Sequence, residues 1–202
     1  AEDAWSMDQE SVDLNAYLAL ECKLLKKFAG ILGVTFDGLD YSSQVADYFF
    51  DKEKGFFFDR RLKDGSFIQE PGCEAYTPLW TKVATADQVK AMLPLLTDTA
   101  KFSTYIPFPT VAADHPKYNP RGYWRGPIWL DQTYFAIRGL RNYGYNKMAD
   151  EYTLQVFDRL QGLKEGAPIH ENYGTHTGEL LKAPHFSWSS SHLLMLYDDY
   201  GK

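Results

Sequence analysis

Two kinds of helix-like segment alternate along this chain, and the alternation limits the folds it can adopt. Residues 127–143 carry apolar side chains almost all the way round, which is typical of a helix buried on several sides. Residues 146–162 combine a narrow apolar stripe with a charged opposite face, as expected of an outer helix. Inner helices that alternate with outer helices predict a toroid of αα-hairpins.

The other helix-like segments follow the same order of inner and outer helices. They cover residues 8–33, 42–52, 77–85, 86–101 and a last segment from about 188. Together they amount to roughly three and a half hairpins, which is fewer than a closed ring needs. The sequence therefore predicts an all-α fold that forms part of a toroid.

Three connections interrupt the helical pattern. The stretch FFFDRRLKDGSFI (residues 56–68) predicts two short strands around a turn, which is a small β-hairpin inserted into the helical fold. The long loops 102–126 and 163–187 both follow an outer helix and precede an inner one. They should leave the same end of the ring, where we expect a binding site.

The composition narrows the classes of function. Aromatic residues make up 16% of the chain, and many stand beside polar residues, as in clefts that bind sugars. A large core also needs bulky side chains, so this alternative stays open. The net charge is −6 with scattered basic pairs, which excludes a basic surface for nucleic acid, and no apolar run is long enough for a bilayer. The compartment is not determined, with the bacterial periplasm or secretion preferred over the cytoplasm.

The end of the first long loop, YNPRGYWRGPIWLDQ, is a candidate sugar subsite. Trp124 and Trp129 would supply aromatic walls, and we expect them to line different parts of one pocket rather than stack on each other. Arg125 and Asp131 would bond sugar hydroxyls, and Pro127 would start the following helix. The alternative is a Trp-rich helix start packed inside the ring, with Arg125 paired to an acid.

Further candidates for substrate binding come from two other segments. The stretch FIQEPGCEAYTPLW contributes Glu74 and Trp80, and the region after the second long loop contributes Trp188. Glu74 could equally well cap the helix that begins at Pro78.

The stretch GAPIHENYG places Glu171 in a short loop beside Asn172 and Tyr173. Glycoside hydrolysis needs one protonated and one ionised carboxyl group across the scissile bond. A hydrogen-bonded, partly solvated loop glutamate fits the ionised one, and Tyr173 could contact the sugar. No histidine pair shows the spacing of the HExxH zinc motif, so we expect neither a metal nor a cofactor.

Five blocks of this sequence resemble glycoside hydrolase family 63, the processing α-glucosidases and their bacterial relatives. The blocks are SVDLNAYL, GCEAYTPLW, YWRGPIWLDQ, PIHENY and APHFSWSSSHLLMLY. They occur in the family's order and span nearly the whole chain. Trehalases share only a looser version of the set.

The resemblance implies an (α/α)6 barrel that hydrolyses a terminal α-linked glucose from an oligosaccharide with inversion, with Glu171 as the general base. In the family, the general acid is an Asp upstream of the helix that carries VDLN, and this chain has no residue at that position. By this resemblance, residues 1–202 are the C-terminal segment, roughly half, of one catalytic barrel. The remainder of the barrel would be its partner, and the chain alone should be inactive.

Two alternatives to the hydrolase stay open. A polysaccharide lyase can also be built on an α/α toroid, with Tyr173 or His170 as the base and Arg125 against a uronate. The missing acid also allows a non-catalytic half-barrel, used for binding or as a scaffold.

Overall fold

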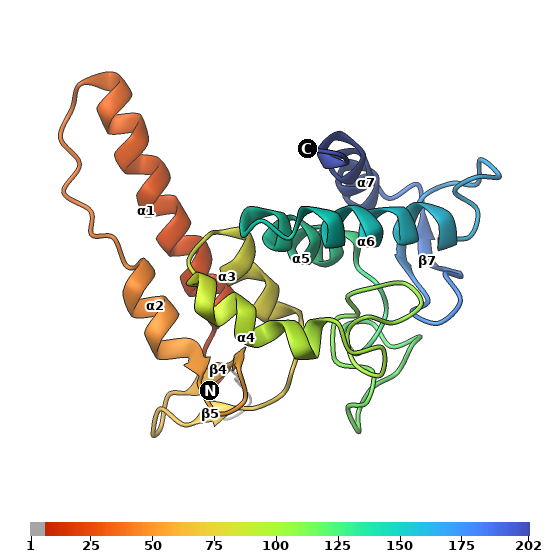
Figure 1. Cartoon of the computed structure of the whole chain (residues 1–202), viewed down its shortest axis with the longest axis horizontal. Helices are drawn as coiled ribbons and strands as arrows, with labels where there is room; N and C mark the ends of the chain where they lie inside the picture. Colours follow the sequence, from red (N-terminus) through yellow and green to blue (C-terminus); the bar gives the residue numbers. More distant parts are fainter. Residues whose placement is uncertain (1–6) are drawn as a thin grey trace, which may run out of the picture.

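The computed structural model describes residues 7–202, and its helices form two layers (Figure 1). The inner helices are α1 (Val12–Leu32), α3 (Thr77–Trp80), α5 (Leu130–Asn142) and α7 (Ser187–Asp199). The outer helices are α2 (Ser42–Phe49), α4 (Ala86–Leu96) and α6 (Asn146–Arg159). Each inner helix contacts the next inner helix, and α2 and α6 pack on α1 and α5. This arrangement confirms the predicted partial toroid of three and a half helix pairs.

Helix α5 lies at the centre of the inner layer, and it begins later than the sequence predicted. Pro127 does not start the helix, because Ile128 forms a β-bridge with Tyr173 in which each N–H donates to the other carbonyl at 2.9 and 3.0 Å. The helix begins at Leu130. Gly139 then lets α5 approach α3 closely, since a Cβ there would lie 2.6 Å from the Cβ of Leu79.

Short antiparallel strands connect the helices. They are β1 (Gln9–Glu10), β2 (Phe50–Asp51), β3 (Phe56–Phe57), β4 (Asp59–Arg61), β5 (Phe67–Ile68), β6 (His170–Tyr173) and β7 (Leu180–Pro184). The predicted hairpin is present as β4–β5, and β1 adds to it in the order β1-β4-β5. Strand β3 pairs instead with β2, so α2 ends at Phe49 rather than at residue 52. The β6–β7 hairpin in the second long loop was not predicted.

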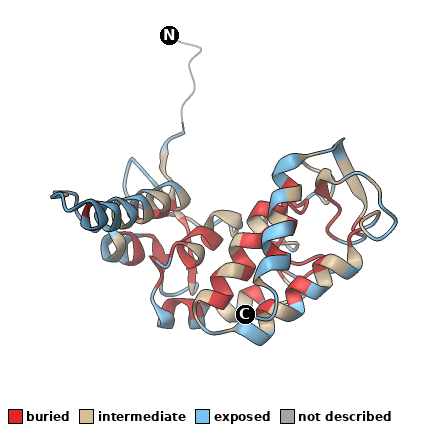
Figure 2. Cartoon of the chain, turned by 90° about the horizontal axis from the view of Figure 1, so that it is seen from above, coloured by how far each residue is buried: buried red, intermediate tan, exposed pale blue. Residues whose placement is uncertain are grey.

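The core is rich in aromatic side chains and lies between the two helical layers (Figure 2). Phe56 and Phe102 stack at 5.5 Å, and Tyr76 and Phe108 pack edge to face at 5.7 Å. The buried Tyr76 hydroxyl donates to the Pro109 carbonyl at 2.9 Å, which satisfies the only polar atom of that side chain. A 3-10 turn, η1 (Cys73–Tyr76), leads from this core into α3.

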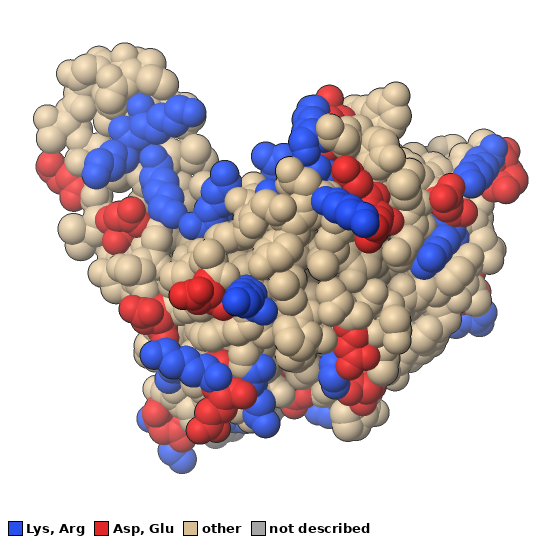
Figure 3. Space-filling model, viewed as in Figure 1, with Lys and Arg blue, Asp and Glu red and all other residues tan. Residues whose placement is uncertain are grey.

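Helix α1 exposes most of its large apolar side chains. It buries small side chains such as Ala16 and Ala19, whereas Leu14, Phe28 and Ile31 are 67%, 53% and 71% exposed. The molecular surface is hollowed between α1 and α7, and acidic and basic side chains are interspersed over this face (Figure 3). Within residues 7–202, no helix combines the length and the apolar character needed to cross a membrane.

Candidate active site

Glu171 lies on β6 at the end of the ring from which both long loops emerge. Its Oε1 accepts a hydrogen bond from the Tyr123 hydroxyl, and its backbone carbonyl accepts one from Ser189 Oγ at 2.9 Å. Strand β6 pairs with β7 on one side and bridges to Ile128 on the other. Segments from three parts of the chain therefore hold this carboxylate in place.

Direct contacts join the two long loops, which the sequence predicted to leave the same end of the ring. Arg121 forms a two-point ion pair with Glu179, with nitrogen–oxygen distances of 3.0 and 2.8 Å. Thr175 Oγ1 donates to the Gly126 carbonyl at 2.5 Å, and the Thr175 carbonyl accepts from the backbone N–H of Ile106 at 2.9 Å. The loops therefore form one surface around Glu171.

The two tryptophans of the first loop stack on each other, so the expectation that they would not was wrong. The rings of Trp124 and Trp129 lie 4.1 Å apart with an interplanar angle of 7°. The indole N–H of Trp129 donates to the Tyr123 carbonyl at 2.8 Å. This bond holds the Trp129 ring parallel to the Trp124 ring. Trp129 is 2% exposed and Trp124 is 43% exposed, so only the outer ring is open to a ligand.

Aromatic side chains at the start of α7 extend this stack. Trp188 lies 5.7 Å from Trp129, centroid to centroid, and Phe186 lies 6.2 Å from Trp188. Trp188 is 44% exposed. Trp124, Trp188 and Tyr123 therefore expose aromatic surface around Trp129, and the Tyr123 hydroxyl joins this cluster to the carboxylate of Glu171.

The structure brings Glu74 and Arg125 together with Trp124 in one pocket of about 260 Å³. Its walls are formed by Glu70, Gly72, Glu74, Thr110, Val111, His115, Lys117, Trp124 and Arg125. Desolvation raises the pKa of Glu74 to about 8, and nearby acidic side chains add to the effect. Burial therefore favours the protonated form of Glu74.

Two other candidates lie apart from this pocket. Asp131 is 3% exposed, its Oδ2 accepts from the Gln132 amide at 2.8 Å, and burial raises its pKa. Trp80 packs on Phe135, with centroids 4.5 Å apart. Both positions belong to the wall of inner helices.

Tyr173 does not face the site. It is 1% exposed, and its hydroxyl accepts a hydrogen bond from the backbone N–H of His170 at 3.0 Å. Its predicted contact with substrate is therefore wrong for this structure, because its ring is packed in the core. The same burial removes Tyr173 as the base of a lyase.

The sequence did not single out Tyr123, Lys117 or Ser189, which the structure places at the site. Tyr123 directly precedes Trp124, so its motif was visible although its partner was not. Nothing in the spacing of Lys117 or Ser189 pointed to Glu74 or Glu171.

Among residues 7–202, no three His, Cys, Asp or Glu side chains gather in a way that could hold a metal ion.

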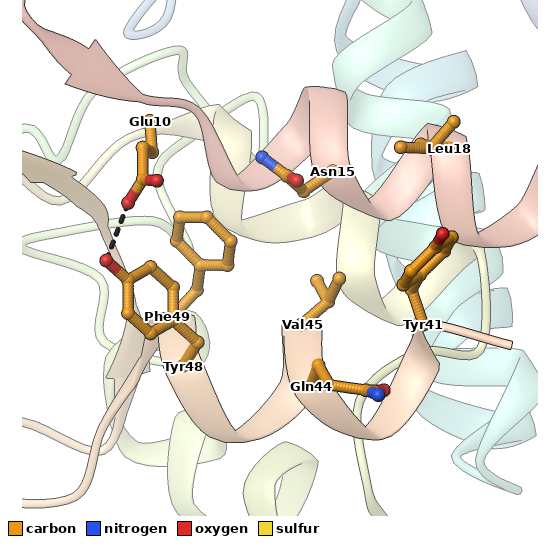
Figure 4. Close-up of a pocket in the computed structure, with 8 residues that line it drawn as sticks. All are labelled: Glu10, Asn15, Leu18, Tyr41, Gln44, Val45, Tyr48 and Phe49. Atoms are coloured by element: carbon orange, nitrogen blue, oxygen red, sulfur yellow. Dashed lines mark hydrogen bonds between the residues drawn. The ribbon is translucent and has the colours of Figure 1, made fainter. Parts of the chain in front are cut away.

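A second pocket, of about 250 Å³, lies between α1 and α2 (Figure 4). Leu18, Val45 and Phe49 give it apolar walls, and the Tyr48 hydroxyl donates to Glu10 at 2.6 Å. The carboxylate of Glu10 is thus already bonded. This pocket resembles a packing surface more than a reaction site.

Comparison with known protein families identifies the family of this chain. The family model described as "Mannosylglycerate hydrolase MGH1-like glycoside hydrolase domain" matches residues 2–189. The chain belongs to this glycoside hydrolase family. The predicted relationship to glycoside hydrolase family 63 is therefore confirmed.

Two curated relatives of this glycoside hydrolase domain are mannosylglycerate hydrolases. The chain is 28% identical over 143 residues to a mannosylglycerate hydrolase of Thermus thermophilus, covering 70% of this chain and 33% of the relative. It is 27% identical over 154 residues to the mannosylglycerate hydrolase of Rubrobacter radiotolerans, covering 74% and 34%. The chain thus spans about a third of the length of these curated relatives.

Solved structures support the fold. A family 63 mannosylglycerate hydrolase of Thermus thermophilus, in complex with Tris and D-glycerate, superposes with a TM-score of 0.78 at 22% identity, over 93% of this chain and 45% of that chain. The neutral trehalase of Saccharomyces cerevisiae superposes with a TM-score of 0.74 at 18% identity, over 96% and 38%. Both likenesses establish the toroid of this glycoside hydrolase domain.

Proposed function

We propose that this domain is part of an inverting α-glycosidase in which Glu171 is the general base. The observation that carries the proposal is the geometry of Glu171, a carboxylate bonded by the hydroxyl of Tyr123, whose ring lies 6.1 Å from that of the exposed Trp124. An ionised, oriented carboxylate in a partly solvated position can take a proton from water. That water attacks the anomeric carbon on the face opposite the leaving group.

The general acid of this reaction is an aspartate outside residues 1–202. It protonates the glycosidic oxygen while Glu171 deprotonates water. An inverting pair of carboxyl groups lies roughly 6.5–9.5 Å apart, which leaves room for the water. The acid therefore faces Glu171 across the open end of the ring.

The substrate class follows from the pocket beside Glu171 and from the names of the relatives. We infer a terminal α-linked hexose joined to a small acid, because Lys117 and Arg125 place two cations in the pocket next to Trp124. Mannosylglycerate, on which the relatives are named to act, has this form. A neutral glucose oligosaccharide, the substrate of an α-glucosidase, is the rival within the same mechanism.

The remainder of the barrel is the proposed partner of the exposed face of α1. The chain spans about a third of its relatives' length, so most of a complete enzyme lies outside it. The exposed apolar side chains of α1 and the pocket between α1 and α2 (Figure 4) offer apolar surface for neighbouring helices. Those helices would also bring the general acid.

The test is Glu171→Gln in the complete catalytic domain, with the exposed Glu165 of the same loop changed to Gln as the control. The amide keeps the shape of Glu171 but cannot accept the proton, so turnover should be lost while Glu165→Gln retains it. Proton NMR of the first product should show the inverted anomer from mannosylglycerate. Turnover near wild type in Glu171→Gln, or a retained anomer, would overturn the proposal.

A further inference from the structure

A β-bulge interrupts the β6–β7 hairpin directly opposite the proposed base. On either side of the bulge the paired residues are Asn172 with Leu181 and His170 with Pro184. Two residues of β7, Lys182 and Ala183, therefore lie opposite a single residue of β6, Glu171. A bulge of this kind bends its strand and redirects the side chains that the strand carries.

Lys182 adopts a backbone conformation that favours glycine. Its φ is 61°, in the left-handed region where the Cβ of other residues crowds the following carbonyl. Two other left-handed positions of the same loop, Gly166 and Gly178, are glycines. His185 is left-handed as well, with φ of 58°, but histidine is found in this region more often than lysine is. The bulge therefore keeps a side chain at a position where glycine would fit without strain.

The Lys182 side chain leads from the bulge to the ring of Tyr123. Its Nζ lies 6.0 Å from the centroid of that ring, at the limit of a cation–π contact. The ammonium forms no ion pair with any carboxylate of residues 7–202. Lys164 of the same loop, in contrast, pairs with Asp158 at 2.9 Å. The phenol ring is thus the group to which the structure directs the charge of Lys182.

Tyr123 is the side chain that joins the aromatic cluster to Glu171. Its ring packs edge to face with Trp129 at 5.0 Å and with Trp124 at 6.1 Å, and its hydroxyl donates to Glu171. Tyr123 is nevertheless 48% exposed, so the two tryptophans cover its ring only in part. Lys182 supplies a further contact from β7.

We propose that this bulge is a positioning device for the base, in which Lys182 holds the ring of Tyr123 so that its hydroxyl stays bonded to Glu171. This inference rests on the proposed function and adds Lys182 as a positioning residue that acts through Tyr123. The attraction is that of a cation for the electron-rich face of the phenol. A glycine at position 182 would relieve the backbone but would lose this contact.

Lys182→Gly separates the backbone from the side chain. Glycine adopts the left-handed conformation without strain, so this change should raise the urea midpoint of the complete catalytic domain. The same change removes the ammonium, so kcat on mannosylglycerate should fall by about fivefold while KM stays nearly constant. A more stable but slower enzyme is the expected result.

Two further substitutions test the charge. Lys182→Met keeps the length of the side chain and loses the cation, so kcat should again fall by about fivefold. Lys182→Arg keeps a cation that can lie over the ring, so it should retain kcat within about twofold. Lys164→Met is the matched control in the same loop, and it should leave both kinetic constants unchanged.

A double-mutant cycle with Tyr123→Phe shows whether Lys182 acts through the phenol. Phenylalanine lacks the hydroxyl that bonds Glu171, so adding Lys182→Met to Tyr123→Phe should lower kcat by less than about 1.5-fold further. A further loss of about fivefold would mean that Lys182 acts elsewhere, and it would overturn the inference. Wild-type kcat in Lys182→Met alone would overturn it as well.

Glu171→Gln in the same assay separates this inference from the proposed function. If Glu171→Gln loses turnover while Lys182→Met keeps all of it, Glu171 stands as the base and only the role of Lys182 is wrong. If Glu171→Gln keeps its turnover, the base and the positioning device both fall. The urea midpoint needs no substrate, and a lower midpoint in Lys182→Gly would contradict the strained bulge.

Discussion

The phenol of Tyr123 donates a hydrogen bond to Oε1 of Glu171, which lies 48 residues further along the chain. The bond to this carboxylate raises the pKa of Tyr123, so the phenol remains a donor across the working range of a neutral enzyme. Tyr123 therefore orients the proposed base without itself exchanging a proton.

Tyr123→Phe should lower kcat more than it changes KM. The ring that packs at 5.0 Å from Trp129 remains, and only the bond to Glu171 is lost. Without that bond the carboxylate is less well oriented toward the attacking water, so kcat should fall by about tenfold. Steady-state kinetics on the proposed substrate measures both constants.

The matched control is Tyr48→Phe, which removes a phenol-to-carboxylate bond to Glu10 on the far side of the domain. Its kcat should stay at the wild-type value. Equal losses in both variants would mean that Tyr123 acts through stability alone.

Trp124→Ala should lower kcat/KM by on the order of a hundredfold, about 2.7 kcal/mol. Trp124 is the exposed member of the stack, so its loss removes aromatic surface from the ligand side while Trp129 stays packed. A mixed effect on kcat and KM is expected, because the ring both binds and orients the sugar. A thermal melt checks the fold, and unchanged kcat/KM would make Trp124 core filling.

The helical layers could be predicted because each helix carries its own signal. The apolar character of α5 all round its axis and the single stripe of α6 are local patterns of about two to four turns, and both helices formed with the predicted roles. The end of α1 at Gly33 was equally local, since this residue adopts the left-handed conformation with φ of 66°.

Features that depend on distant partners could not be read in the same way. Pro127 is a good first residue for a helix, but pairing of Ile128 with Tyr173 delays α5 to Leu130. The β6–β7 hairpin has no clear apolar alternation and is fixed by tertiary contacts.

Within the site, the sequence identified Glu171, Glu74, Trp124 and Arg125 as residue types suited to sugar chemistry. It could not show that Glu74 and Arg125 share a pocket or that Trp124 stacks on Trp129, because loop conformation decides both.

Gly139→Ala should destabilise the domain by about 1–3 kcal/mol. Its Cβ would meet Leu79 Cβ at 2.6 Å and backbone atoms of Leu79 and Trp80 at 3.3 Å, where α5 crosses α3. Gly30→Ala in α1 is the matched control, because nothing lies within 4 Å of the added methyl group. It should instead stabilise the helix by about 0.5–1 kcal/mol. Urea unfolding of both variants in one background measures the difference, and equal changes would contradict the close approach of α3 and α5.

The exposed face of α1 should behave in opposite ways in the isolated chain and in the complete barrel. Leu18 is 47% exposed here and lines the pocket between α1 and α2, where neighbouring helices are proposed to pack. In residues 1–202 alone, this face should bind a hydrophobic dye and drive self-association, and Leu18→Gln should reduce both. In the complete domain Leu18→Gln should lower the free energy of unfolding by about 2 kcal/mol or more, because it loses apolar burial and buries an amide.

Lys27→Gln, on an exposed position of the same helix, is the control and should change neither self-association of the isolated chain nor stability of the complete domain. Light scattering and urea unfolding give the two readouts. If the isolated chain is a compact monomer that melts cooperatively and binds no dye, the α1 face has no missing partner.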